Sequence, residues 1–237
     1  MVKRGKRYMA ASAIIDRERN YEPVVAAGLI KQISAVKFDE TVELHMSTEA
    51  DPRHADQLIR GVVLLPHGLG KTVRVLVFAQ GDAARHASDA GADYVGDDDL
   101  IKRIEGGWVE FDVAIATPEM MGKVGRLGKV LGRRGLMPNP RTGTVVRAEG
   151  IARSVSEARQ GRVEVRMDRS AIIHVPIGKV SFEDTALIEN LASVIETVVK
   201  ARPAGVKGQF IRAAYMTTTM GPSIRLDLST LLELKVE

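Results

Sequence analysis

The chain has 237 residues, 45% of them hydrophobic and 27% charged, with a formal charge of 34 − 30 = +4, which is ordinary for a globular protein with a substantial core. It contains no Cys, which excludes a disulfide scaffold, a zinc–thiolate site, an iron–sulfur cluster and a Cys nucleophile. No apolar run approaches the roughly 18 residues that span a membrane, and no apolar segment follows the basic N-terminus (Lys3, Arg4, Lys6, Arg7), so neither an anchor nor a secretory signal is expected.

The first third of the chain predicts two helices and a strand. Residues 8–19 and 22–35 are expected to be helical, and Pro23 suits the first turn of the second helix. Apolar and polar residues then alternate over residues 41–46, which is typical of a half-buried strand. Glu43 lies on the polar face of that strand, which is available to a partner.

From residue 61 onward, β-branched runs alternate with short helical segments. Strands are expected at 62–65, 73–79, 92–95 and 111–116, and helices at 82–90, at 97–105 and from 118 onward. This order predicts a parallel sheet with helices on both faces over about residues 68–159.

The last third returns to an α+β pattern. Strands are expected at 162–167, 171–175, 207–220 and 223–228, with a long amphipathic helix at 183–202. The economical interpretation is an α+β split domain carrying an inserted α/β, Rossmann-like domain with a parallel sheet. The split domain takes residues 1–67 and 160–237, and the inserted domain takes residues 68–159.

Charge is unevenly distributed along the chain. Residues 81–119 carry 3 − 10 = −7 and residues 120–159 carry 9 − 2 = +7, whereas residues 1–68 and 160–237 each carry 10 − 9 = +1. Such asymmetry marks either a nucleic-acid face or two segments that pair or stay solvated. Only ten residues are aromatic (five Phe, four Tyr, one Trp), so an RNA partner is expected to be recognised by shape, backbone and 2′-hydroxyls more than by stacked bases.

Residues 68–72 (GLGKT) resemble the end of a phosphate-binding P-loop. The full motif requires Gly where Leu65 stands, and a helix must follow the loop so that its amides face the phosphates. Residues 73–79 predict a strand instead, so a glycine turn between domains is the favoured interpretation.

Other motifs give little support to catalysis. The run Asp97–Asp98–Asp99 is better placed to cap a helix N-terminus than to hold a metal. The five His residues lack paired metal-ligand spacing, and no nucleophile motif occurs. We therefore expect no enzymatic activity, no metal and no cofactor.

Two segments have the composition of binding loops. Residues 123–144 are rich in basic residues, Gly and Pro, which suits either an RNA-facing or partner-facing loop or a mobile solvated one. Residues 215–223 offer hydroxyls followed by Gly221, which suits either contacts to a sugar–phosphate backbone or a plain edge strand with a turn.

Blocks along nearly the whole chain resemble the bacterial family of large-subunit ribosomal protein L-one, the side-stalk protein. The blocks are KFDETVE (37–43), the block from RG through PHG (60–68), AGAD (90–93), FDVAIATP (111–118), RGLMPNP (134–140) and TTTMGPS (217–223). The resemblance implies a split α+β domain that binds large-subunit ribosomal RNA and carries an inserted α/β domain. It further implies a cytoplasmic protein of the 50S subunit that helps release deacylated tRNA from the exit site and represses its own operon by binding the messenger.

The resemblance also implies an RNA-binding site. Phe38 packs at the site, Glu43 accepts hydrogen bonds from ribose hydroxyls, and the segment Thr219, Met220 and Gly221 presents a hydroxyl and close backbone to the RNA. The neighbours expected to take part are Lys37, Thr41, Thr217 and Ser223.

Arg133 stands where the family usually has Pro, so the loop within residues 123–144 is expected to differ locally in shape from that of the family. Two other functions are also compatible with the sequence. One is a nucleotide-binding α/β enzyme that uses the middle domain. The other is an interaction module in which the oppositely charged segments dock protein partners.

Overall fold

A computed structural model describes residues 5–234, so Lys3 and Arg4 of the basic N-terminus lie outside the described residues. The chain divides into two units, each with its own sheet and core. Unit 1 is formed by the residues up to Gly70 together with those from Val163 onward, and unit 2 by Lys71–Arg162. No helix among the described residues is long and apolar enough to cross a bilayer.

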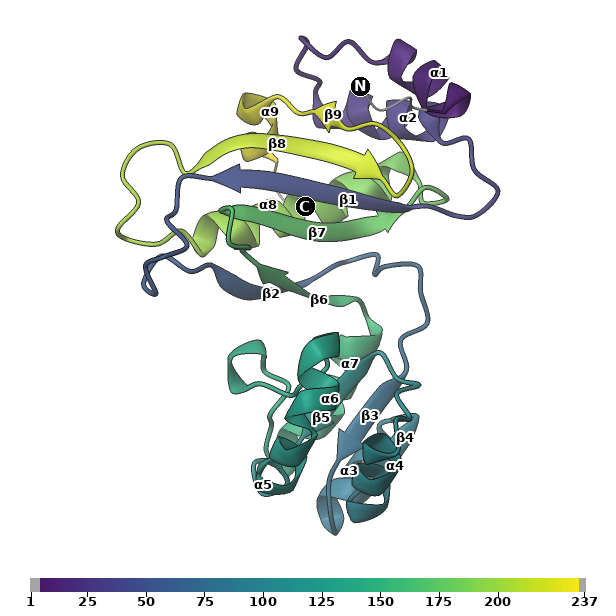
Figure 1. The fold of residues 1–237 in the computed structure, drawn as a ribbon, viewed down its shortest axis with the longest axis vertical. Helices are drawn as coiled ribbons and strands as arrows, with labels where there is room; N and C mark the ends of the chain where they lie inside the picture. Colours follow the sequence, from purple (N-terminus) through teal and green to yellow (C-terminus); the bar gives the residue numbers. More distant parts are fainter. Residues whose placement is uncertain (1–4, 235–237) are drawn as a thin grey trace. The chain divides into compact units, whose positions relative to one another are not determined.

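Unit 1 is organised around an antiparallel sheet with the order β7-β1-β8-β9 (Figure 1). Its strands are β1 (Thr41–Thr48), β7 (Ile172–Lys179), β8 (Ile211–Thr218) and β9 (Ile224–Arg225). The expected alternation in β1 is confirmed, because Val42, Leu44 and Met46 are fully buried while the residues between them remain partly exposed. Burial of each such side chain stabilises the fold by about 1.5–3 kcal/mol.

Helices cover the apolar face of this sheet. Helix α2 (Pro23–Ile33) begins at Pro23, and α8 (Asp184–Lys200) buries Leu187, Leu191, Val194 and Val198 at helical spacing. Both contribute to the same core as β1, and so do α1 (Lys6–Ile14) and α9 (Leu228–Glu233). The polar face of the sheet is therefore the one that can receive a ligand.

A second, two-stranded sheet joins β2 (Arg60–Leu64) and β6 (Arg162–Arg166). The Arg60 Nε atom lies 2.8 Å from Glu164 Oε1 across this pair. The pair is partly exposed, so this ion pair contributes at most about 1 kcal/mol.

Unit 2 holds a three-stranded parallel sheet with the order β4-β3-β5. The strands are β3 (Val75–Phe78), β4 (Tyr94–Gly96) and β5 (Val113–Ala116). Leu76 and Phe78 pack into one core cluster, and Val75 and Val77 pack into another. Because successive strand residues point to opposite faces, helices cover both sides of this sheet, as the sequence predicts.

The helices of unit 2 divide between those two faces. Helices α3 (Asp82–Asp89) and α7 (Ile151–Arg159) pack with Val75 and Val77. Helix α4 (Asp98–Glu105) packs on the other face with a chain of short helical pieces. These pieces are α5 (Met121–Val124), η1 (Gly125–Leu127), α6 (Gly128–Leu131) and η2 (Gly132–Arg134). Two further short helices follow along the chain, η3 (Pro140–Thr142) and η4 (Ala148–Gly150), and η4 packs with α3 and α7.

Several expected boundaries differ from the structure. The helix expected over residues 8–19 ends at Ile14, and the strand expected from residue 207 begins at Ile211. Helices α7 and α9 form where no helix is expected. The strand expected over 223–228 is shortened to Ile224–Arg225, and α9 begins at Leu228.

The acidic run lies at the start of α4 as expected, with Asp98 and Asp99 in the first turn of the helix. Asp97 stands at the N-cap position, but its side chain does not make the expected capping hydrogen bond. Its Oδ2 atom instead accepts a hydrogen bond from Gln80 Nε2 at 2.9 Å, and this bond is the main cause that lowers the pKa of Asp97.

Candidate nucleic-acid interface

The polar face of the unit 1 sheet brings Glu43 and Thr217 together. Antiparallel pairing of β1 with β8 places Glu43 directly opposite Thr217, and pairing with β7 places Thr41 opposite Lys179. Side chains directly opposite each other on one face of a sheet lie within contact range. Glu43, Thr41 and Thr217 are partly exposed, so carboxylate and hydroxyl oxygens line one open surface.

Two large apolar side chains stand exposed at one end of this sheet. Phe38 precedes β1 by three residues and Met220 follows β8 by two, and the register of the strands brings these ends side by side. Phe38 is 52% exposed and Met220 is 55% exposed. Lys37, Thr219 and Ser223 are exposed at the same end. An exposed apolar pair rimmed by polar groups is typical of a binding surface.

The Thr219 hydroxyl ties the two strand ends to each other. Its Oγ1 atom accepts a hydrogen bond from the Thr41 amide at 3.2 Å and lies 3.5 Å from the Thr41 carbonyl oxygen. Thr217 Oγ1 lies 3.2 Å from the Thr218 carbonyl oxygen and 3.5 Å from that of Gly221. The hydroxyls therefore shape the turn after β8 as well as facing outward.

A buried carboxylate that the sequence analysis missed holds this turn in place. Glu40 is only 1% exposed, and its Oε1 atom accepts a hydrogen bond from the Met220 amide at 2.8 Å. Its Oε2 atom accepts a hydrogen bond from the Ser34 hydroxyl at 2.5 Å. Buried carboxylates are tolerated only when hydrogen-bonded, so Glu40 links the end of α2 to the segment that carries Met220.

Gly221 is required where the turn passes closest to β8. A Cβ atom at this position would collide with the Thr218 Oγ1 atom. Thr218 is 2% exposed, and its hydroxyl makes no hydrogen bond within the described part of the chain. A hollow of about 230 Å³ opens beside the turn and is lined by Tyr8, Glu40, Met220 and Gly221, among others.

Lys179 supplies positive charge at this end of the sheet. Its Nζ atom donates to Thr41 Oγ1 at 2.9 Å and lies 3.4 Å from the Asp39 carbonyl oxygen. The Asp39 carboxylate in turn accepts hydrogen bonds from the amide and the hydroxyl of Ser181. Lys179 thus places a positive charge beside Thr41 at this end of the sheet.

The structure gives no support to a nucleotide site at residues 68–72. Strand β3 follows that loop, so no helix N-terminus faces it, and Lys71 Nζ lies 2.5 Å from Asp112 Oδ1. The Lys71 and Arg74 hydrogen bonds outweigh burial and lower the pKa of Asp112, which keeps it charged as an ion-pair partner. Across residues 5–234 no cluster of His, Asp and Glu is arranged to hold a metal ion.

Comparison with known proteins decides the family. The model of the "Ribosomal protein L1p/L10e family" matches residues 29–222. The large ribosomal subunit protein uL1 of Dehalococcoides mccartyi strain BAV1 is 58% identical over 96% of both chains, and that of Chloroflexus aggregans is 57% identical over the full length of both. The protein of the same name from Thermomicrobium roseum is 55% identical over 98% of this chain and 97% of its own. The chain belongs to the ribosomal protein L1 family.

The residues matched by the L1 family model include most of the candidate interface. Phe38, Glu43 and the turn at Thr219–Gly221 fall inside residues 29–222, and Ser223 lies immediately beyond them. The buried Glu40 also lies inside the match. The match covers most of both units, so it includes these residues together with most of the chain.

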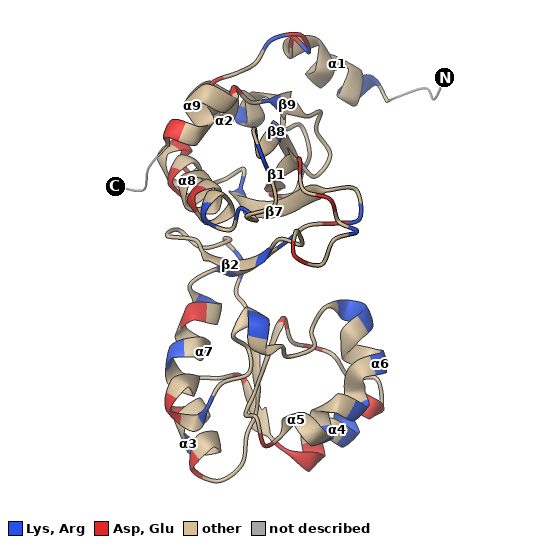
Figure 2. Cartoon of the chain, turned by 90° about the vertical axis from the view of Figure 1, so that its left-hand side faces the viewer, with Lys and Arg blue, Asp and Glu red and all other residues tan. Residues whose placement is uncertain are grey.

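The L1 family chain also carries a basic segment in unit 2. Lys and Arg residues gather along α6 and the short helices near it (Figure 2). Two ion pairs join this part of the chain to the acidic segment, Lys123 to Asp98 at 2.8 Å and Arg159 to Asp93 at 3.2 Å. In the described ranges no ion pair involves Arg126, Lys129, Arg133, Arg134 or Arg141.

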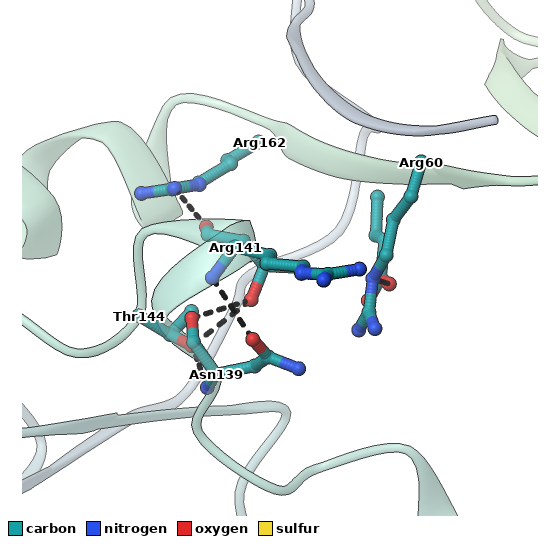
Figure 3. Close-up of polar contacts among 7 residues, drawn as sticks. Arg60, Asn139, Arg141, Thr144 and Arg162 are labelled. Atoms are coloured by element: carbon teal, nitrogen blue, oxygen red, sulfur yellow. Dashed lines mark hydrogen bonds and ion pairs between the residues drawn. The ribbon is translucent and has the colours of Figure 1, made fainter. Parts of the chain in front are cut away.

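The loop of the basic segment is folded around Asn139 (Figure 3). The Asn139 side chain accepts a hydrogen bond from the Arg141 amide at 2.9 Å, and the Asn139 amide donates to Thr144 Oγ1 at 2.8 Å. Arg162 donates to the Thr142 carbonyl oxygen. These bonds give the loop a defined turn.

Proposed function

We propose that this member of the L1 family is a structural component of the large ribosomal subunit and binds large-subunit ribosomal RNA through unit 1. The observation that carries the proposal is the exposed pair Phe38 and Met220 beside the Glu43–Thr217 surface. The name shared by the relatives supports the assignment to the large subunit. No feature of the described residues favours catalysis over this role.

The chemistry of the surface suits ribose better than phosphate. An ionised carboxylate only accepts hydrogen bonds, so Glu43 can bind a ribose 2′-hydroxyl but repels a phosphate. Thr217, opposite it, can donate or accept. Phe38 and Met220 supply apolar contact to a base or sugar. Recognition of this kind distinguishes RNA from DNA through the 2′-hydroxyl.

The same surface accounts for two finer roles that we also propose. The chain would repress its own operon by binding a similar RNA structure in the messenger, and as part of the mobile side stalk it would help release deacylated tRNA from the exit site. Both follow from the family resemblance. A messenger bound at this surface depends on the same residues as the ribosomal RNA, so the variants below act on both RNAs.

Truncation of the exposed side chains is expected to weaken RNA binding without unfolding the protein. Phe38→Ala and Met220→Ala each remove contacts that the side chain makes only in the RNA complex, and Thr219→Ala also removes a hydrogen bond within the turn. The binding free energy is expected to fall by about 1–3 kcal/mol where a polar partner is left unpaired. Dissociation constants for a ribosomal RNA fragment, measured at one salt concentration, test this. Leu64→Ala is the matched control, since Leu64 is an exposed apolar residue on β2. Wild-type affinity in all three variants would refute the site.

A further inference from the structure

Two imidazoles face each other on the polar face of the unit 1 sheet. His45 on β1 lies opposite His174 on β7, with the two Nδ1 atoms 2.7 Å apart and the ring centroids 4.9 Å apart. The side chains are 25% and 50% exposed. A separation of 2.7 Å is a hydrogen bond, so one Nδ1 carries a proton and the other accepts it.

A carboxylate flanks each end of this pair. His45 Nε2 lies 3.6 Å from Glu43 Oε2, and His174 Nε2 lies 3.6 Å from Asp168 Oδ2. Asp168 is held in its turn by the amides of Ser170 at 2.7 Å and Ile172 at 2.9 Å. The Ile172 bond is the main cause that lowers the pKa of Asp168, so it stays ionised wherever His titrates. Glu43, the proposed ribose contact, is thus the outer member of a line of four groups.

Among the protonation states of these four groups, one matches a hydrogen to an acceptor at every contact between neighbouring groups. In the neutral pair, the imidazole that donates from Nδ1 must leave its own Nε2 as a bare lone pair facing a carboxylate. One added proton gives both Nε2 atoms a hydrogen while the Nδ1–Nδ1 bond survives. A second added proton removes the Nδ1 acceptor and breaks that bond. The singly protonated pair is therefore the state in which both carboxylates are matched.

The surroundings of His45 oppose that charge in the free protein. Burial is the largest cause that lowers the pKa of His45, the charge of His174 lowers it further, and Glu43 raises it. From the third strand, Tyr215 on β8 is the residue opposite His45. Burial and the neighbouring imidazole therefore disfavour a proton on His45 in the free protein, and a ligand that brings negative charge can offset this effect.

Resting on the RNA-binding function proposed above, we propose that His45 and His174 are positioning residues for Glu43 and that binding of RNA loads one proton onto the pair. The phosphates of a bound RNA favour positive charge nearby, and a positive pair offsets the Glu43 carboxylate that would otherwise repel the RNA. Linkage is reciprocal: if RNA promotes protonation, protonation strengthens RNA binding. Affinity therefore rises as the pH falls through the range in which the pair takes up its first proton.

The test uses the full chain and a fragment of large-subunit ribosomal RNA at constant ionic strength between pH 8 and pH 6. Wild-type affinity is expected to rise as the pH falls, with a slope no steeper than about tenfold per pH unit, the limit for one proton. Calorimetry in buffers of different ionisation enthalpy is expected to show net proton uptake on binding. Both effects are expected to shrink in His174→Asn and in the double variant with His45→Asn. His86→Asn, an exposed His on α3, is the control and keeps the wild-type slope.

The outcomes separate this inference from the RNA-binding function itself. A wild-type slope retained in the double variant, or no proton uptake on binding, overturns the inference while leaving the RNA site intact. Absence of specific binding at every pH overturns the proposed function instead. If the double variant fails to fold, His174→Asn alone decides, because its side chain is half exposed. A merely structural role would change affinity equally at every pH and leave the slope unchanged.

Discussion

Gly221→Ala is expected to lower the affinity for ribosomal RNA by about ten- to a hundredfold. The added methyl would collide with Thr218 Oγ1, and the Thr218 side chain is only 2% exposed, so one of the two must shift. Overpacking of this kind costs about 1–3 kcal/mol. The turn relieves it by shifting, which displaces Thr219 and Met220 from the surface. Each 1.4 kcal/mol of lost binding energy weakens affinity about tenfold.

A second-site variant and a control variant show whether the collision with Thr218 causes the effect of Gly221→Ala. Thr218→Ala combined with Gly221→Ala removes the colliding hydroxyl and is expected to recover most of the affinity. Gly128→Ala is the matched control, since a Cβ there meets nothing within 4 Å. Unchanged RNA binding by the single variant Gly221→Ala would show that the close passage of this turn does not matter.

Glu40→Ala is expected both to weaken RNA binding by tenfold or more and to lower the free energy of unfolding by about 1–3 kcal/mol, the cost of leaving buried donors unpaired. The variant removes the hydrogen-bond acceptor of the Met220 amide and of the Ser34 hydroxyl. Glu40→Gln is expected to retain most of both properties. Its carbonyl oxygen can accept from Met220, and its amide can donate to Ser34, whose hydroxyl also accepts.

Urea unfolding and RNA titration of the same two Glu40 variants check this expectation. Glu164→Ala is the control, because Glu164 is a partly exposed acid in a surface ion pair worth at most about 1 kcal/mol. If Glu40→Ala behaves like Glu164→Ala, the buried carboxylate does not hold the turn. If Glu40→Gln is as damaging as Glu40→Ala, the negative charge itself is required.

Local periodicity predicts the elements that bury a regular face. Strand β1 alternates as its sequence indicates, and α8 buries residues at three- and four-residue steps. Helix α7 has the same spacing in Ile151, Val155 and Ala158, but a buried Ser154 interrupts the apolar pattern. Helix α9 spans only six residues, and its cap at Asp227 is the main local signal.

The interface is predictable only in part, because its geometry depends on contacts between distant residues. Glu43 is indicated by the alternation of its strand and by the family resemblance, and Thr217 by the resemblance and by the hydroxyl-rich segment that contains it. The role of Glu40 depends on an amide 180 residues away, and the two imidazoles are 129 residues apart. Neither contact leaves a periodic pattern, since strand register is set by the whole sheet.

Net charge alone points to a different surface. The segment with +7 charge lies in unit 2, whereas the chain segments that form the proposed RNA site are nearly neutral. Affinity dominated by phosphate contacts falls steeply with salt, in proportion to the number of phosphates neutralised. A site built from hydroxyls, apolar contacts and one carboxylate is expected to have a shallower dependence.

Cross-linking of the full chain to a ribosomal RNA fragment by ultraviolet light, followed by mass spectrometry of the peptides, tests the location of the site most directly. We predict that RNA is attached to peptides containing Phe38 and to peptides containing Met220. We also expect Gly221→Ala to reduce both cross-links together. Cross-links confined to residues 123–141 of unit 2 would refute the proposed site, because RNA would then bind the basic segment and leave the unit 1 sheet free.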